Sequence, residues 1–266
     1  MKLNCLLLLP LLLLVACKSS EGDVNKNMPE PAPDSGISGT NLVIPDNLDK
    51  EEYQLLLFGN SHIGGLSTLL NTLISHGLPN KTLTVRSASS QRYLAERLTD
   101  GVSLDILKND AWTHVILQAQ KYSQSGAYDY PTVGAQRWIQ LAKEQQTTPI
   151  LFPEHPQRGN KTEGLRLYEL HKSIAAKQSA CVAPIGLVWD KVIALRPELE
   201  LHHSDGNHAS ELGKFLSALV FYEILTGRSA DLLTYISTLD VDAQTQDFFG
   251  QIVSQVIAEN PPCVNA

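Results

Sequence analysis

The hydrophobic pattern of this chain changes period many times between residues 53 and 258. Five short and nearly continuous apolar runs are typical of strands buried on both faces. These runs lie at 53–58, 82–85, 114–118, 149–152 and 181–186. Between and after them, apolar residues recur every three or four positions, which is typical of amphipathic helices. We expect helices at 65–76, 91–98, 132–145, 162–178, 187–195, 209–226 and 242–258.

The alternation of strands and helices predicts an α/β fold with a mainly parallel, five-stranded sheet covered by helices on both faces. In such sheets, ligands bind beyond the carboxyl ends of the strands. Small and polar residues follow four of the five predicted strands at that edge. They are Gly59–His62, Ser87–Gln91, Gln118–Gln120 and Pro153–Pro156. We therefore expect a functional site at this edge of the sheet.

The first fifty residues differ from the rest of the chain. Residues 1–16 hold one lysine and then an apolar stretch that is shorter than the about 20 residues of a membrane-spanning helix, which is typical of a secretory signal. The end of this stretch, Leu-Val-Ala-Cys17, resembles the lipobox of bacterial lipoproteins, which implies cleavage before Cys17 and lipid attachment to its thiol. Residues 17–50 are expected to form the lipidated cysteine and a flexible tether. Residues 51–266 are expected to form the folded domain.

Composition and cysteine content limit the partners of the domain. The formal net charge is −7 and the sequence shows no basic cluster, so a nucleic-acid surface is not expected. Two cysteines, Cys181 and Cys263, remain after the signal and lipidation segments. In an oxidising compartment they can pair, and the bond would stabilise the fold by about 4 kcal/mol. The alternative is two unpaired thiols, because the sequence does not give the Cα separation that pairing requires.

Ser61 stands at the first strand-to-helix turn, where backbone N–H groups and the helix dipole favour negative charge. A serine there can attack a carbonyl carbon while its own N–H holds the oxyanion, although serine is also a common helix cap. A serine nucleophile needs a base and a group that orients the base. Asp205 and His208 lie three residues apart on a turn that contains Gly206. The carboxylate can therefore bond Nδ1 of the imidazole and leave Nε2 facing Ser61.

Ser61 after the first strand, with Asp205-Gly-Asn-His208 before a late helix, resembles the SGNH (GDSL-like) hydrolase superfamily over residues 52–226. Asn60, where the commoner form carries Asp, resembles a GNS-bearing subgroup. The resemblance implies a flavodoxin-like three-layer α/β/α sandwich and ester hydrolysis in a catalytic domain spanning 51–266. It implies an acyl-enzyme on Ser61, with His208 as general base and Asp205 as its orienting carboxylate. This chemistry requires no cofactor and no metal.

The same resemblance implies three donors to the oxyanion. They would be the N–H of Ser61, a backbone N–H of the second sequence block and a side-chain amide of the third. In the second block Ser90 is the best match to the usual glycine. In the third block Gln120 matches the usual asparagine by position, and Gln118 is the alternative. The residues expected to contact the substrate are Asn60, Gln118 and His155.

These features predict a serine esterase of the bacterial cell envelope, anchored by lipid on Cys17. Lys18 after the cysteine resembles lipoproteins of the outer membrane, which implies a domain facing the periplasm or the cell surface. The expected substrate is an O-acyl ester, such as an O-acetyl ester, on a carbohydrate or cell-envelope glycan, and the acyl group could be hydrolysed or transferred. The alternatives are a lipid or thioester hydrolase and a catalytically silent glycan-binding lipoprotein of the same fold.

A metal hydrolase is a further alternative, because several ligand types occur after the fourth strand and before the late helix. They are Glu154, His155, His202, His203, Asp205 and His208. No HExxH motif or similar spacing joins them, and a metal site would leave Ser61 without a role. The serine esterase is therefore the preferred interpretation.

Overall fold

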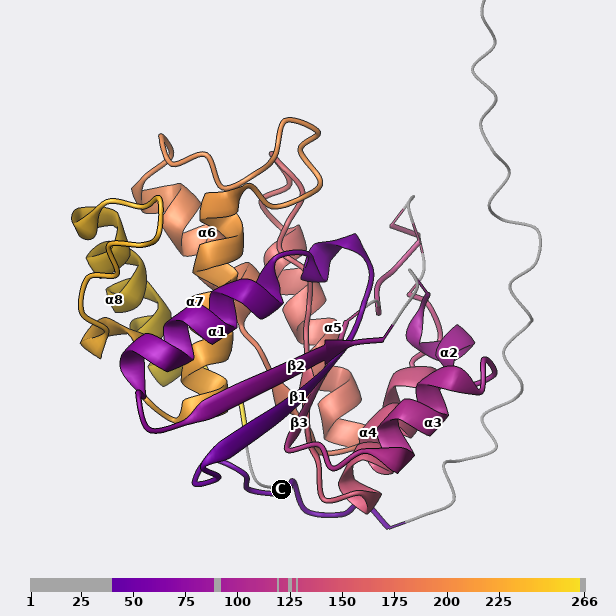
Figure 1. The fold of residues 1–266 in the computed structure, drawn as a ribbon. Helices are drawn as coiled ribbons and strands as arrows, with labels where there is room; N and C mark the ends of the chain where they lie inside the picture. The colour runs from indigo at the N-terminus through magenta and orange to yellow at the C-terminus, as the bar shows by residue number, and fades with distance from the viewer. Residues whose placement is uncertain (1–39, 89–91, 119, 124–125, 128, 264–266) are drawn as a thin grey trace, which may run out of the picture. The chain divides into compact units, whose positions relative to one another are not determined.

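The computed structural model describes residues 40–88, 92–118, 120–123, 126–127 and 129–263. Its strands are β1 (Glu52–Phe58), β2 (Thr82–Ser87), β3 (His114–Leu117), β4 (Thr148–Leu151) and β5 (Cys181–Val182). They form one parallel sheet in the order β2-β1-β3-β4-β5 (Figure 1). This is the flavodoxin-like strand order, so the predicted fold class is confirmed.

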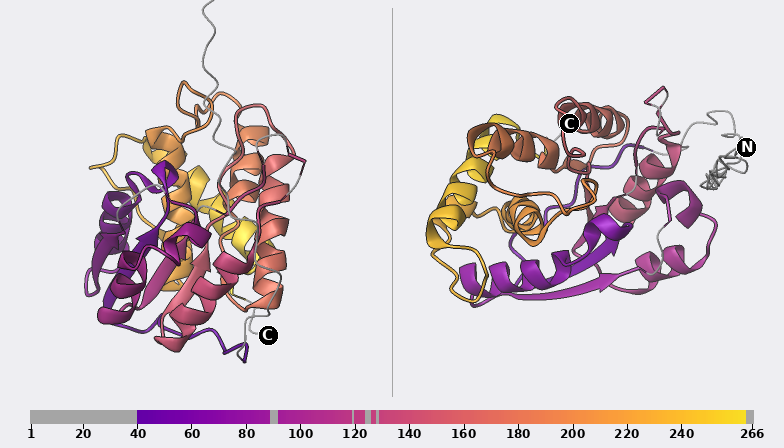
Figure 2. Two further views of the ribbon diagram at one scale, coloured as in Figure 1. Left: turned by 90° about the vertical axis from the view of Figure 1, so that its right-hand side faces the viewer. Right: turned by 90° about the horizontal axis from the view of Figure 1, so that it is seen from above.

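Eight α-helices and two 3₁₀ turns connect and follow these strands within the described residues (Figures 1 and 2). The α-helices are α1 (Leu66–Gly77), α2 (Leu94–Arg97), α3 (Val102–Asn109), α4 (Val133–Glu144), α5 (Glu163–Lys177), α6 (Ile185–Leu195), α7 (Glu211–Thr226) and α8 (Ala243–Glu259). The 3₁₀ turns are η1 (Ser61–Ile63) and η2 (Ala230–Leu232). None of the described helices is long and apolar enough to cross a membrane.

The sheet separates two hydrophobic cores, because successive side chains of a strand point to opposite faces. In β1, Leu55 and Leu57 join the core formed with α1, α6, α7 and α8. Leu56 and Phe58 join the core formed with α2, α3, α4 and α5. All four side chains are completely buried. The continuous apolar run of β1 is therefore explained by burial on both faces.

Two elements, α3 and β5, differ clearly from the sequence prediction. Helix α3 was not expected, because only Ile106 and Leu107 of its apolar residues are buried and the helix has barely two turns. Asp100 stabilises its start by accepting a hydrogen bond from the N–H of Ser103 at 2.8 Å. Strand β5 ends at Val182, four residues earlier than predicted, because Pro184 lacks an N–H for the ladder and stands at the start of α6.

Part of the segment predicted as a flexible tether packs against the domain, which corrects the boundary expected at residue 50. Ile44 and Asn47 are buried. The Asn47 amide donates hydrogen bonds to the carbonyl oxygen of Thr113 at 2.9 Å and to that of Gln146 at 3.1 Å. These contacts satisfy carbonyl groups beside the amino ends of β3 and β4, which is a long-range role that local composition does not reveal. The predicted signal segment 1–16 and Cys17 lie outside the described residues.

A disulfide joins Cys181 to Cys263, which lie 82 positions apart in sequence, with an S–S distance of 2.02 Å. It attaches the segment after α8 to the edge of the sheet. Beside the disulfide, the N–H of Val182 donates to the carbonyl oxygen of Pro262 at 2.9 Å. The carboxyl-terminal segment therefore covers the otherwise open edge of β5.

Candidate active site

The turn after β1 presents Ser61 at the carboxyl edge of the sheet. Gly59 begins the turn, and a Cβ at this position would lie 2.5 Å from Oε1 of Gln118, so only glycine fits without displacement. The Asn60 side chain accepts a hydrogen bond from the N–H of His62 at 3.0 Å and closes η1. Gly65 then adopts a φ of 80°, a left-handed conformation that lets the chain turn from η1 into α1.

The loop between α6 and α7 carries the other two predicted catalytic residues. Gly206 has a φ of 72°, and the N–H of His203 donates to the carbonyl oxygen of His208 at 2.8 Å, so the loop folds back on itself. Oδ1 of Asp205 accepts hydrogen bonds from the backbone N–H groups of Asn207 and His208, both at 2.9 Å. The aspartate is thus held by the same short turn that holds the histidine.

Ser61, His208 and Asp205 form one hydrogen-bonded chain, although 147 residues separate the serine from the histidine in sequence. Oγ of Ser61 lies 2.7 Å from Nε2 of His208, and Nδ1 of His208 lies 2.6 Å from Oδ2 of Asp205. Figure 1 shows the turn after β1 and the orange loop that leads into α7 at the same end of the sheet. This is the arrangement in which a histidine can accept a proton from a serine hydroxyl.

The electrostatics of the hydrogen bonds between Ser61, His208 and Asp205 favour one protonation pattern. Hydrogen bonds from the backbone N–H and the imidazole of His208 hold the pKa of Asp205 well below its usual range. An ionised carboxylate can only accept, so Nδ1 of His208 carries the proton and Nε2 is the acceptor for the Ser61 hydroxyl. About 40% of the His208 and Asp205 side-chain surface is exposed, so these side chains are open to solvent and to a ligand.

The predicted oxyanion donors are only partly described. Ser90 lies outside the described residues. Gln120 is 5% exposed, and its amide donates to the carbonyl oxygen of Tyr130 at 3.0 Å, which occupies one of its two N–H bonds. Gln118 is completely buried, and both ends of its amide are engaged. The structure therefore gives Gln118 a supporting role beneath the turn in place of the predicted contact with a substrate.

Gln118 belongs to a buried polar network that joins the serine turn to the histidine loop. Its Oε1 accepts the N–H of Asn60 at 2.7 Å, and its Nε2 donates to Oε1 of Glu154 at 2.6 Å. Nζ of Lys121 lies 3.3 Å from a carboxylate oxygen of Glu154 and 3.3 Å from one of Glu163.

From Glu163 the network continues to the histidine loop. Glu163 accepts the N–H of Gln157 at 2.6 Å, and the Gln157 side chain donates to Oδ1 of Asn207 at 3.2 Å. Burial alone would lower the pKa of Lys121, but Glu154 and Glu163 raise it above its ordinary value. From sequence, Glu154 is expected only as a possible metal ligand, because nothing in its local sequence pairs it with Gln118 or Lys121.

Two histidines lie beneath the site. His62 stacks on His208, with ring centroids 5.1 Å apart and an interplanar angle of 22°. Burial lowers the pKa of His62, which favours its neutral form beside the imidazole of His208. His155, which was expected to contact a substrate, is 3% exposed and stacks on Trp189 at a centroid distance of 4.0 Å. It therefore packs below the site instead of lining its surface.

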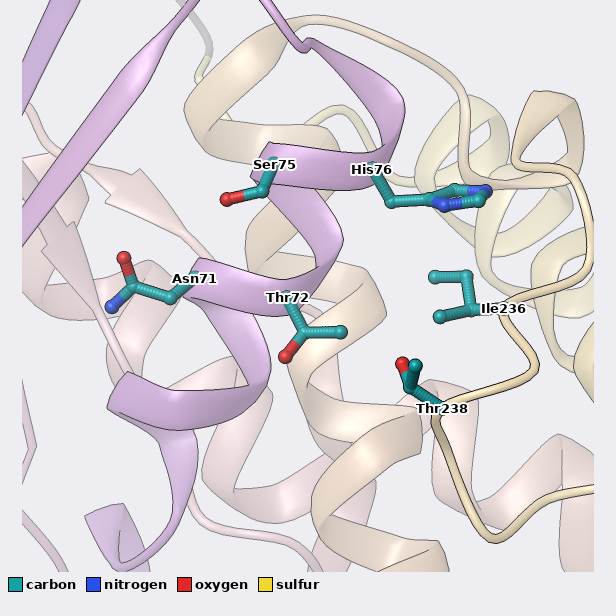
Figure 3. Close-up of a pocket in the computed structure, with 6 residues that line it drawn as sticks. All are labelled: Asn71, Thr72, Ser75, His76, Ile236 and Thr238. Atoms are coloured by element: carbon teal, nitrogen blue, oxygen red, sulfur yellow. The ribbon is translucent and has the colours of Figure 1, made fainter.

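Two further observations define the limits of the site. No three of the histidine, cysteine, aspartate or glutamate side chains in the described part of the chain are grouped as ligands for a metal ion. A separate open hollow of about 480 Å³ lies between α1 and the segment before α8, where Thr72 and His76 face Ile236 and Thr238 (Figure 3). His76 is ten residues along α1 from its start, about 15 Å, so this hollow is remote from Ser61.

Models of known families and curated proteins give no match to this chain. Solved structures do. One, from Slackia heliotrinireducens and described as a candidate SGNH hydrolase, is 23% identical, with a TM-score of 0.51 over 65% of this chain and 98% of its own. Another, a DUF4886 family protein from Bacteroides uniformis, is 12% identical, with a TM-score of 0.58 over 80% of this chain and 98% of its own. The chain therefore has the three-layer α/β/α fold found in SGNH hydrolases.

Proposed function

We propose that the protein is a serine esterase. The observation that carries this proposal is the hydrogen-bonded chain from Ser61 through His208 to Asp205, at 2.7 and 2.6 Å. Structural stability does not require three such groups at a strand end, with two of them about 40% exposed. A histidine held by an ionised carboxylate, with Nε2 turned to a serine hydroxyl, is the machinery of acyl transfer.

In the proposed reaction, Oγ of Ser61 attacks the ester carbonyl carbon while Nε2 of His208 takes the hydroxyl proton. The resulting oxyanion would be held by the N–H of Ser61 and by Gln120, with a backbone N–H at Ser90 as a further donor. The intermediate collapses, the C–O bond to the alcohol breaks, and His208 returns the proton to the leaving alcohol. Water then attacks the acyl-enzyme, again with His208 as base, and releases the acid and Ser61.

The proposal extends to substrate and location. The exposure of His208 and Asp205 leaves room for an ester with a large alcohol part, such as an O-acetyl ester of a carbohydrate. The signal-like segment 1–16 and the lipobox-like sequence before Cys17 favour a lipid-anchored protein of the bacterial cell envelope. An acetylated envelope glycan or an acetylated polysaccharide would meet the protein there.

The test is hydrolysis of p-nitrophenyl acetate by the purified full chain. Ser61→Ala and His208→Ala should each lower kcat/KM by about 10⁴-fold or more, because each removes an essential member of one unit. Ser204→Ala, a change at an exposed serine of the same loop, is the matched control and should leave the rate unchanged. A wild-type protein that neither hydrolyses the ester nor takes a label from a serine-directed phosphonate would overturn the proposal and favour a silent binding protein.

A further inference from the structure

A second polar pocket of about 260 Å³ opens beside the loop that carries His208. Its walls come from the segment after β3, the segment after β4 and the first turn of α5. Its polar lining includes Lys121, Tyr122, Gln157, Asn160, Glu163 and Arg166.

Two contacts join this pocket to the catalytic loop. Nε2 of Gln157 donates to Oδ1 of Asn207, the residue before His208, at 3.2 Å. The N–H of Arg158 donates to the carbonyl oxygen of Gly206 at 2.8 Å. A group bound against Gln157 is therefore next to the turn that positions the general base.

The charged groups of the pocket are already balanced. Glu163 is 2% exposed, lies 3.3 Å from Nζ of Lys121 and accepts the Tyr122 hydroxyl at 2.6 Å. The guanidinium of Arg166 lies 3.2 Å from Asp129 and stacks on the Tyr122 ring at 3.7 Å. Neither cation is left to attract a phosphate or a carboxylate, so an anionic ligand would gain little here.

The lining also argues against an acyl chain. Apart from one aromatic ring and Gly126, it consists of amide, hydroxyl, carboxylate, ammonium and guanidinium groups, which an alkyl chain would desolvate without replacing their hydrogen bonds. A neutral ring with several hydroxyls can donate to a side-chain amide oxygen and accept from the N–H groups of the amides and the guanidinium. The volume is below the about 300–1,000 Å³ of pockets that enclose drug-sized ligands, so it suits a single monosaccharide.

We propose that this pocket binds the sugar residue that carries the ester, as the alcohol side of the substrate. The inference rests on the proposed esterase function and narrows it. It favours acetylated carbohydrates over lipid esters and thioesters, whose apolar or charged parts do not match the lining. Asn160 and Arg166 are the specificity-determining residues, because both are exposed at the pocket wall and carry donors that a sugar hydroxyl can use.

The experiment compares two esters with one acyl group. The full chain is assayed on p-nitrophenyl acetate and on O-acetylated methyl glycosides of glucose, mannose, galactose and xylose. In Asn160→Ala and in Arg166→Met, the ratio of kcat/KM on the best glycoside to kcat/KM on p-nitrophenyl acetate should fall about tenfold, as expected for one or two lost hydrogen bonds to a neutral ligand. Asn71→Ala, an asparagine at the remote hollow of Figure 3, should leave this ratio unchanged.

The outcomes separate the two proposals. If wild type hydrolyses p-nitrophenyl acetate but the variants keep the wild-type ratio, the sugar pocket is refuted and the esterase stands. If no ester is hydrolysed, the esterase proposal is refuted. Saturation-transfer NMR with the unacetylated methyl glycosides then tests whether the pocket binds a sugar. A signal in wild type and in Asn71→Ala that is lost in Asn160→Ala supports the pocket, whereas no signal in wild type refutes it.

Discussion

The buried carboxylate of Glu154 allows a sharp test of how the serine turn is held. Glu154 is 4% exposed, and its two oxygens have different partners. One accepts the amide of Gln118 at 2.6 Å, and the other lies 3.3 Å from Nζ of Lys121. Glu154→Gln preserves the shape of the side chain but replaces one acceptor by an NH₂ group. Whichever way the new amide is turned, a donor faces either Gln118 or the ammonium group of Lys121.

The expected loss of unfolding free energy in Glu154→Gln depends on the contacts that Lys121 keeps. Removing one member of a fully buried ion pair costs about 3–5 kcal/mol. Lys121 keeps Glu163 at 3.3 Å, and 20% of its side-chain surface stays exposed, so we expect a loss of about 2 kcal/mol. For a domain of this size, about 2–4 °C of Tm accompanies each kcal/mol, so Tm should fall by about 4–8 °C.

The same change should also affect the position of Ser61, the proposed nucleophile. Oε1 of Gln118 accepts the N–H of Asn60 at 2.7 Å. If Nε2 of Gln118 loses its acceptor on Glu154, the Gln118 amide is held less firmly and positions the turn at Asn60 less well. We expect kcat on p-nitrophenyl acetate to fall about tenfold, with little change in KM, because the lost interaction orients Ser61 and does not bind substrate. Thermal unfolding and steady-state kinetics on the same preparation measure both effects.

A double-mutant cycle with Lys121→Met tests whether the stability loss in Glu154→Gln arises from the contact with Lys121. In that background Glu154→Gln should cost about 1 kcal/mol less, because the ammonium group that it would face is gone. Glu200→Gln is the matched control, since Glu200 is 77% exposed and its ion pair with Arg158 spans 3.4 Å. A Glu154→Gln protein with wild-type Tm and kcat, or a cycle with no coupling, would refute the argument that this network positions the turn.

Two further predictions concern stability. Burial lowers the pKa of His114 and of His155 to about 3 and that of His171 to about 4, whereas the ordinary pKa of an unfolded histidine is 6.5. As pH falls below 6.5, the unfolded chain therefore binds protons that the folded protein does not bind, and the folded state loses stability. Each histidine should cost about 1.2 kcal/mol between pH 6 and pH 5, about 3.5 kcal/mol together, and a Tm that stays constant over this range would contradict the prediction. Replacing both Cys181 and Cys263 by serine should lower the unfolding free energy by about 4.5 kcal/mol, the loop-closure value for 82 residues, and an unshifted urea midpoint would show that the bond does not stabilise the fold.

Several features of this protein follow from local sequence alone. The apolar runs predict the strands because a strand buried on both faces carries apolar residues at successive positions, as β1 does at 55–58, β3 at 115–117 and β4 at 149–151. The pairing of Asp205 with His208 follows from a spacing of three on a glycine turn, since so short a loop leaves the carboxylate few other partners. The position of Ser61 at the carboxyl edge follows from its place directly after the first strand.

Other features depended on contacts between distant parts of the chain. The segment at 41–48 was predicted as tether, yet the Asn47 side chain binds carbonyl groups 66 and 99 residues away. Gln118 was predicted to face the substrate, yet its amide hydrogen-bonds to Asn60 and Glu154, which lie 58 and 36 residues away. A buried amide or carboxylate takes whichever partner the packing brings near it, and its own neighbours in sequence do not reveal which. The sequence therefore determined the sheet, the serine turn and the histidine loop, whereas only the tertiary structure decided which polar side chains support the site and which remain open to a ligand.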